Sequence, residues 1–143
     1  MKSINILLIE DNPGDVELTR EALSSGKIRN HLEVVSDGEQ ALDYLRKQPP
    51  YTDVSTPDII LLDLNLPKVD GREVLQAVKS DLNLRQIPVI ILSSSEAASD
   101  IQQSYDLHAN CFISKPVQLD RFLDIVQMIE CFWIDIVKLP GKG

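Results

Sequence analysis

Short apolar runs alternate with amphipathic stretches along the chain. Three runs are nearly unbroken, at residues 4–9, 59–62 and 89–92, and two weaker ones cover residues 31–36 and 111–113. Short runs without an alternation of apolar and polar residues are typical of strands buried on both faces, as in a parallel sheet. The pattern therefore predicts five buried strands.

The stretches between the runs carry apolar residues at helical spacing. We expect helices at residues 15–25, 39–47, 71–80, 96–107 and 118–137. Five strand–helix units in succession predict an α/β protein with a doubly wound parallel sheet. Residues 47–57 contain three prolines and are predicted to form a surface loop. We expect a single domain over residues 1–143 with an extended C-terminal helix.

Composition narrows the classes of partner. The chain has 143 residues and a formal net charge of −8. This charge argues against nucleic acid and anionic membranes, because both need clusters of lysine and arginine. Cys111 and Cys131 lack metal-ligand spacing, so we expect reduced thiols in a cytoplasmic protein. We expect neither a signal peptide nor a membrane span.

The strongest chemical signal lies where the predicted strands end. Glu10 and Asp11 follow the first run, Asp63 the third and Ser93 the fourth, while Lys115 follows the fifth. The carboxyl ends of parallel strands meet at one edge of a sheet, and ligands bind there. Any single acid in such a position is more often a solvated loop residue. The joint pattern predicts a functional acidic site.

Three carboxylates close together repel one another, and either a proton or a divalent cation relieves the repulsion. Oxygen ligands favour Mg²⁺. With a cation in place, Asp63 is positioned to attack a phosphorus atom and form an aspartyl phosphate. Lys115 and Ser93 would then stabilise charge on the transferring oxygens.

The segments that carry these residues resemble the receiver domains of two-component response regulators. The resemblance covers residues 4–137, and its motifs are residues 7–11, 63–71 (DLNLPKVDG), 88–93 and 112–116 (FISKP). The spacings from Asp63 to Ser93, Phe112 and Lys115 are those of typical receivers. The resemblance implies a flavodoxin-like sheet of order 2-1-3-4-5 with five helices.

The same resemblance implies a role for each motif residue. Asp63 corresponds to the phosphoacceptor. Asp11 and Asp63 correspond to the metal-ligating acids, with the backbone carbonyl of Asn65 as a third ligand and Glu10 as an outer acid acting through water. Glu10 replaces the commoner aspartate, and its longer side chain is expected to alter metal affinity.

Three further positions correspond to the switch and phosphate-binding residues of the family. Ser93 corresponds to the hydroxyl switch and Phe112 to the aromatic switch. Tyrosine is frequent at the aromatic position in the family, and the phenylalanine of this chain lacks the hydroxyl that would form a hydrogen bond. Lys115 corresponds to the phosphate partner and precedes a proline, Pro116, that the family holds in a cis peptide. His31 and His108 have no partner at ligand or triad spacing, so we interpret both as structural or surface residues.

Within the family, residues 10–23 and 113–133 are most similar to the small regulators paired with cyanobacterial phytochromes. This implies a stand-alone response regulator that takes a phosphoryl group from a histidine kinase of the phytochrome type in the presence of Mg²⁺. Output would come from phosphorylation-dependent protein contacts or onward phosphotransfer. The only catalysis expected is the chain's own phosphorylation and dephosphorylation.

The predicted last helix is apolar on nearly all sides, which is typical of an interface. We expect a homodimer through it; the alternative is that the helix packs over its own domain.

Rival functions fit the sequence less well. A Mg²⁺-dependent phosphatase usually has an acid at the position of Asn65, a flavodoxin needs a phosphate-cradling loop after the first strand, and a nucleotide-binding protein needs a P-loop. A non-phosphorylatable scaffold is the last alternative, although every motif residue is present.

Overall fold

The computed structural model describes residues 4–24, 30–64, 66, 68–93, 111–114 and 120, with only the backbone at 93 and 111–114. Its elements come in the order that the apolar pattern predicts. They are β1 (Ile4–Ile9), α1 (Pro13–Ser24), β2 (Asn30–Val35), α2 (Gly38–Leu45), β3 (Ile59–Asp63), α3 (Gly71–Ser80), β4 (Val89–Ser93) and β5 (Cys111–Ser114). The helix predicted at residues 96–107 lies outside the described residues, as does the helix predicted at residues 118–137 except for residue 120.

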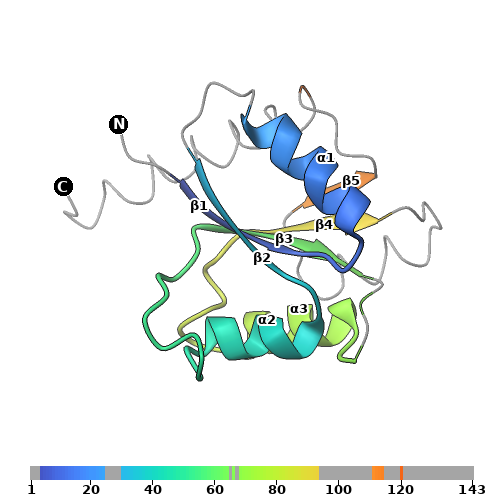
Figure 1. Ribbon diagram of the computed structural model, residues 1–143. Coiled ribbons are helices and arrows are strands. Elements are labelled where there is room, and N and C mark those ends of the chain that lie inside the picture. The colour runs from blue at the N-terminus through green and yellow to red at the C-terminus, as the bar shows by residue number, and fades with distance from the viewer. Residues whose placement is uncertain are drawn as a thin grey trace, which may run out of the picture.

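The strands form one parallel sheet in the order β2-β1-β3-β4-β5. Helix α1 covers one face of the sheet, and α2 and α3 lie side by side on the other (Figure 1). Helices on both faces make the sheet doubly wound, and this confirms the predicted α/β class and the order 2-1-3-4 of the first four strands. None of the helices in the described part of the chain is long and apolar enough to cross a bilayer.

Burial on both faces explains why the strands are unbroken apolar runs. Leu7 and Ile9 of β1 point into the core under α2 and α3, whereas Ile6 and Leu8 point into the core on the other face. All five residues of β3 are buried. Strand β2 lies at the edge of the sheet and alternates between exposed and partly buried positions, so its run is weaker.

Each of the described helices begins directly after a residue whose side chain caps it. Helix α1 begins at Pro13, two residues earlier than predicted, because Asn12 caps it: the Asn12 side-chain oxygen accepts a hydrogen bond from the backbone N–H of Asp15 at 3.0 Å. Asp37 caps α2 and Asp70 caps α3 in the same way. These caps fix where each helix starts relative to the strand before it.

The predicted surface loop joins α2 to β3 and is anchored at two points. The Tyr51 ring packs against that of Tyr44, with centroids 5.3 Å apart. Tyr51 and Val54 both contact the core under α2 and α3. At its end, the Asp58 carboxylate accepts a hydrogen bond from the backbone N–H of Asn5 at 2.8 Å, which joins the beginnings of β1 and β3.

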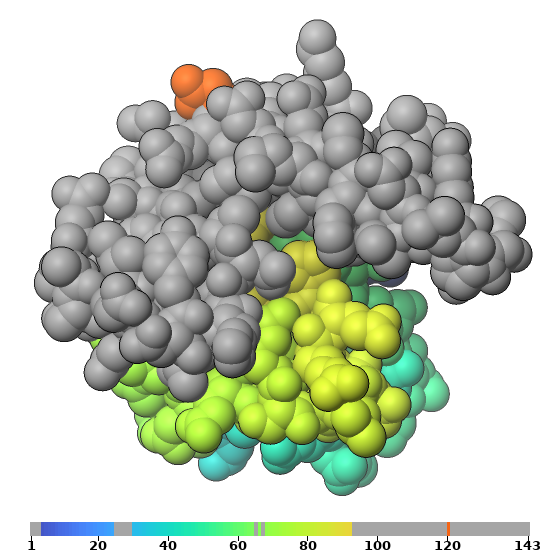
Figure 2. All heavy atoms as spheres, turned by 180° about the vertical axis from the view of Figure 1, so that it is seen from behind, coloured from blue at the N-terminus to red at the C-terminus, as the bar shows by residue number. Residues whose placement is uncertain are grey.

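Seen from behind, α3 lies against the segment that leads into β4 (Figure 2). The Lys79 ammonium donates hydrogen bonds to the backbone carbonyls of Arg85, at 3.2 Å, and Ile87, at 2.9 Å. Partial burial lowers the pKa of this ammonium. Lys79 therefore links α3 to the segment before β4 and helps to fix where β4 begins.

Candidate functional site

Three carboxylates meet at the carboxyl edge of the sheet. Glu10 and Asp11 follow β1, and Asp63 is the last residue of the neighbouring β3. Ile9 is paired with Leu62, so the two strands end at the same level. Carboxylate oxygens of the three residues lie within 4.8 Å of one another. The structure thus brings together the three predicted acids, which we call the acid cluster.

Two members of the acid cluster are removed from solvent. Glu10 is 2% exposed and Asp63 is 3% exposed, while Asp11 is exposed. Burial strengthens the mutual repulsion of negative charges, because less water screens them. A small divalent cation coordinated by the oxygens offsets this repulsion. The donor set consists of hard oxygens, one of them open to solvent, and this fits a cation such as Mg²⁺ that keeps several waters.

Glu10 is fixed at the end of β1 by hydrogen bonds at both its backbone and its side chain. Its backbone N–H donates to the carbonyl of Val35 at 3.0 Å, which prolongs the pairing of β1 with β2. Its carboxylate accepts a hydrogen bond from the backbone N–H of Asn12 at 3.2 Å. The carboxylate therefore lies at the first turn of α1, where the unpaired N–H groups favour negative charge.

The backbone after Asp63 is held against the beginning of α3. The N–H of Gly71 donates to the carbonyl of Leu64 at 3.1 Å. A Cβ atom at Gly71 would overlap the carbonyl oxygen of Asp63 and lie 2.6 Å from the Leu64 Cα. Glycine is required here because of this close approach. It lets α3 support the peptide that carries the Asp63 carboxylate.

Helix α2 supports the same loop from the other side. The Asp37 carboxylate, whose side chain is 8% exposed, lies 3.7 Å from the Lys68 ammonium. It also accepts a hydrogen bond from the backbone N–H of Gln40 at 2.7 Å. A Cβ atom at Gly38 would overlap the carbonyl oxygen of Val69. Neither Asp37 nor Lys68 was predicted to have a role from the sequence. The available signal was the Asp-Gly pair before a predicted helix.

The remaining predicted site residues are described only in part. Asn65 and Lys115 lie outside the described residues, as do the side chains of Ser93 and Phe112. The backbone places Ser93 at the end of β4, one residue beyond Leu92, the partner of Asp63. Phe112 is paired with Ile91 in β5. The backbone of Ser93 thus reaches the edge of the sheet where the acid cluster lies.

A parallel sheet with helices on both faces and an acid cluster at its carboxyl edge places the chain among the flavodoxin-like α/β proteins. Comparison with protein families narrows this class, because the response regulator receiver domain matches residues 6–127. The chain belongs to this family, as its motifs predict.

The relatives of this chain include a response regulator of a cyanobacterial phytochrome. Response regulator Rcp1 of Synechocystis sp. is 43% identical over 136 residues, which are 95% of this chain and 92% of Rcp1. Among solved structures, the phosphorylated cyanobacterial phytochrome response regulator RcpA is 48% identical, with a TM-score of 0.79 over 93% of this chain and 95% of RcpA. The Mn²⁺-bound form of Rcp1 is 42% identical, with a TM-score of 0.77 over 91% and 94%. The likeness to cyanobacterial phytochrome regulators is thereby confirmed.

Proposed function

We propose that this protein is a stand-alone response regulator that accepts a phosphoryl group from a histidine kinase on Asp63 and requires Mg²⁺. The acid cluster carries this proposal, because it places a buried carboxylate of β3 beside two acids of the adjacent strand end. The match to the receiver family supports it independently.

In the proposed reaction, a carboxylate oxygen of Asp63 attacks the phosphorus atom of a phosphohistidine. The new O–P bond forms as the N–P bond breaks, and the imidazole leaves with the electron pair. Asp11, Asp63 and the carbonyl of Asn65 would hold the metal directly, and Glu10 would hold it through water. Bound Mg²⁺ would keep Asp63 ionised and neutralise charge on the transferring oxygens.

We propose that three residues outside the acid cluster complete the site. The Lys115 ammonium and the Ser93 hydroxyl would bind phosphoryl oxygens, with Ser93 moving toward the group and Phe112 turning inward as switches. The chain would catalyse only its own phosphorylation and dephosphorylation. Its output would be phosphorylation-dependent protein contact or onward phosphotransfer in the cytoplasm.

The proposed kinase is of the phytochrome type. RcpA is a phytochrome response regulator, and it shares 48% of its residues with this chain over nearly the full length of both. Identity at that level supports a similar partner. We propose that the complete chain forms one domain of five strands and five helices. Because its net charge is −8, we expect its partners to be proteins rather than nucleic acid.

We further propose that the chain forms a homodimer through an extended helix at residues 118–137. The support is the apolar pattern of this segment, which leaves Phe132 and Ile136 outside a single core-facing stripe. Replacing both by charged residues should give monomers in light scattering. An unchanged mass would contradict the dimer without affecting the phosphoryl chemistry.

Phosphotransfer from a purified, autophosphorylated phytochrome histidine kinase tests the proposed function. The label should pass to the wild type in Mg²⁺ but not in EDTA, and it should not pass to Asp63→Asn. Asp58→Asn is the matched control, because Asp58 precedes the same strand at its opposite end and the amide oxygen retains an acceptor for Asn5. Equal labelling of Asp63→Asn, or equal transfer in EDTA, would contradict the proposal.

A further inference from the structure

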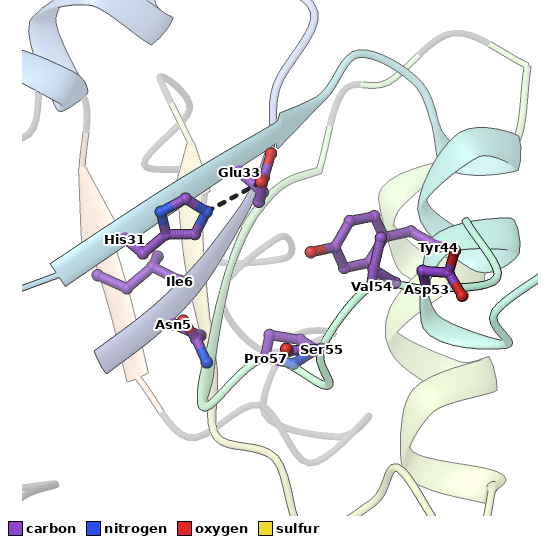
Figure 3. A pocket seen from close by; sticks show the side chains of 9 residues that line it. All are labelled: Asn5, Ile6, His31, Glu33, Tyr44, Asp53, Val54, Ser55 and Pro57. Carbon is purple, nitrogen blue, oxygen red and sulfur yellow. Dashed lines mark hydrogen bonds and ion pairs between the residues drawn. The ribbon is translucent and has the colours of Figure 1, made fainter. Parts of the chain in front are cut away.

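A second candidate site lies at the other end of the sheet from the acid cluster. A pocket of about 270 Å³ opens between the edge strand β2, the C-terminal end of α2 and the loop before β3 (Figure 3). One of its lining residues, Asn5, precedes Glu10 by five positions on β1, a separation of about 17 Å along an extended strand. The receiver chemistry does not use this pocket.

The hydroxyl of Tyr44 points into the pocket (Figure 3). Tyr44 is 7% exposed. Among the described residues no buried side-chain polar atom lacks a hydrogen-bond partner, so the hydroxyl oxygen at the end of the ring is open to solvent in the pocket. Burial, together with the nearby charge of Glu33, raises the pKa of this phenol. The ring is buried while its hydroxyl is open to the pocket, so this oxygen is available to a ligand that replaces water there.

The charge of the pocket selects the kind of ligand. Glu33 and Asp53 contribute carboxylates, whereas the described lining residues include no lysine or arginine. His31 Nε2 lies 2.9 Å from one Glu33 oxygen, and both side chains are at least half exposed. A carboxylate has about four acceptor positions, so this contact leaves Glu33 able to accept further hydrogen bonds. The pocket therefore favours a cation that donates hydrogen bonds.

Size and the remaining walls narrow the ligand further. The volume is below the range of about 300–1,000 Å³ that holds drug-sized molecules. Val54 and Pro57 supply apolar walls, which match a short aliphatic body. A metal ion fits less well, because among the described residues only Glu10, Asp11 and Asp63 bring three ligating groups together.

We propose that this pocket binds a small organic ammonium with a short aliphatic body. Its N–H groups donate to the Glu33 carboxylate and to the phenol oxygen of Tyr44, and its methylene groups lie along Val54 and Pro57. The site is independent of the phosphoryl chemistry.

Titration with 1,4-diaminobutane, followed by ¹H–¹⁵N NMR of the full chain, tests the proposal. Saturating Mg²⁺ is present to occupy the acid cluster. Saturable shifts are expected at the amides of the pocket residues. Glu33→Gln should weaken binding at least tenfold, and Tyr44→Phe should weaken it severalfold with the fold retained. Glu39→Gln removes the same charge from an exposed position in the first turn of α2 and should leave the affinity unchanged.

Neutral 1,4-butanediol of the same length should bind at least tenfold more weakly than the diamine. The proposal is overturned if no saturable shifts appear at the pocket, or if the shifts centre on the acid cluster. It is also overturned if the diol binds as well as the diamine, or if Glu39→Gln weakens binding as much as Glu33→Gln.

Discussion

Replacing Gly71 by alanine probes the packing that supports the phosphoacceptor strand. The added Cβ would overlap the carbonyl oxygen of Asp63 and lie 2.6 Å from the Leu64 Cα and 2.9 Å from the Leu64 oxygen. All three are backbone atoms, so no side chain can rotate away. Ordinary contact begins near 3.4 Å, and the backbone after Asp63 must move to reach it.

The magnitude follows from two opposing effects. Overpacking of a tight interior costs about 1–3 kcal/mol, and backbone contacts favour the upper part of that range. Alanine gains up to about 1 kcal/mol over glycine inside a helix, and less at the first position of α3. We expect Gly71→Ala to lower the free energy of unfolding by about 2 kcal/mol. With a urea m-value of about 2 kcal/mol/M, the midpoint falls by about 1 M.

Gly14→Ala is the matched control. Gly14 also lies in the first turn of a helix, but a Cβ there would meet only the end of the Asn12 side chain, at 3.2 Å. Its midpoint in urea should stay within about 0.3 M of the wild type. Because the Asp63 peptide shifts, Gly71→Ala should also slow phosphorylation by acetyl phosphate about tenfold or more. A Gly71→Ala variant as stable as the wild type would show that no close packing at this position supports the Asp63 peptide.

Three further predictions concern the described contacts. Asp58→Ala removes the acceptor for the N–H of Asn5 and should cost about 1–2 kcal/mol in urea unfolding; an unchanged midpoint would show that water replaces the carboxylate. Asp37→Ala should cost about 1–2 kcal/mol because α2 loses its cap, whereas Asp37→Asn, which keeps the cap and loses only the charge facing Lys68, should cost less than half as much; equal losses would contradict the capping role. Burial raises the pKa of the Tyr44 phenol above 10.0, so the folded chain keeps a proton that the unfolded chain releases. The free energy of unfolding should therefore fall as the pH rises past about 10, and fall less in Tyr44→Phe; urea unfolding between about pH 9 and about pH 11 measures both slopes, and equal slopes would count against the assignment.

The acid cluster was predictable because it follows from local rules. Apolar runs marked β1 and β3, and the residues after a buried strand must lie at the edge of the sheet. Glu10, Asp11 and Asp63 meet because β1 and β3 are neighbours whose ends coincide, a consequence of the strand order. No feature of the sequence indicated their burial.

Contacts between distant segments were not predictable in this way. The Asp37–Lys68 pair depends on how α2 and the loop after β3 come together, and no periodicity encodes that distance. We interpreted His31 as a residue without a partner at ligand or triad spacing. In the structure it contacts Glu33, because residues two apart on a strand share a face. The pocket beside them depends on the path of the loop over Tyr44, which tertiary packing decides.

The intact mass of the protein after incubation with acetyl phosphate tests the central claim most directly, because the donor brings no kinase. The wild type and Asp58→Asn should gain one phosphoryl group in Mg²⁺ and none in EDTA, and Asp63→Asn should gain none in either. A folded wild type that gains no phosphoryl group, or an Asp63→Asn variant that gains as much as the wild type, would contradict the assignment of Asp63 as the phosphoacceptor.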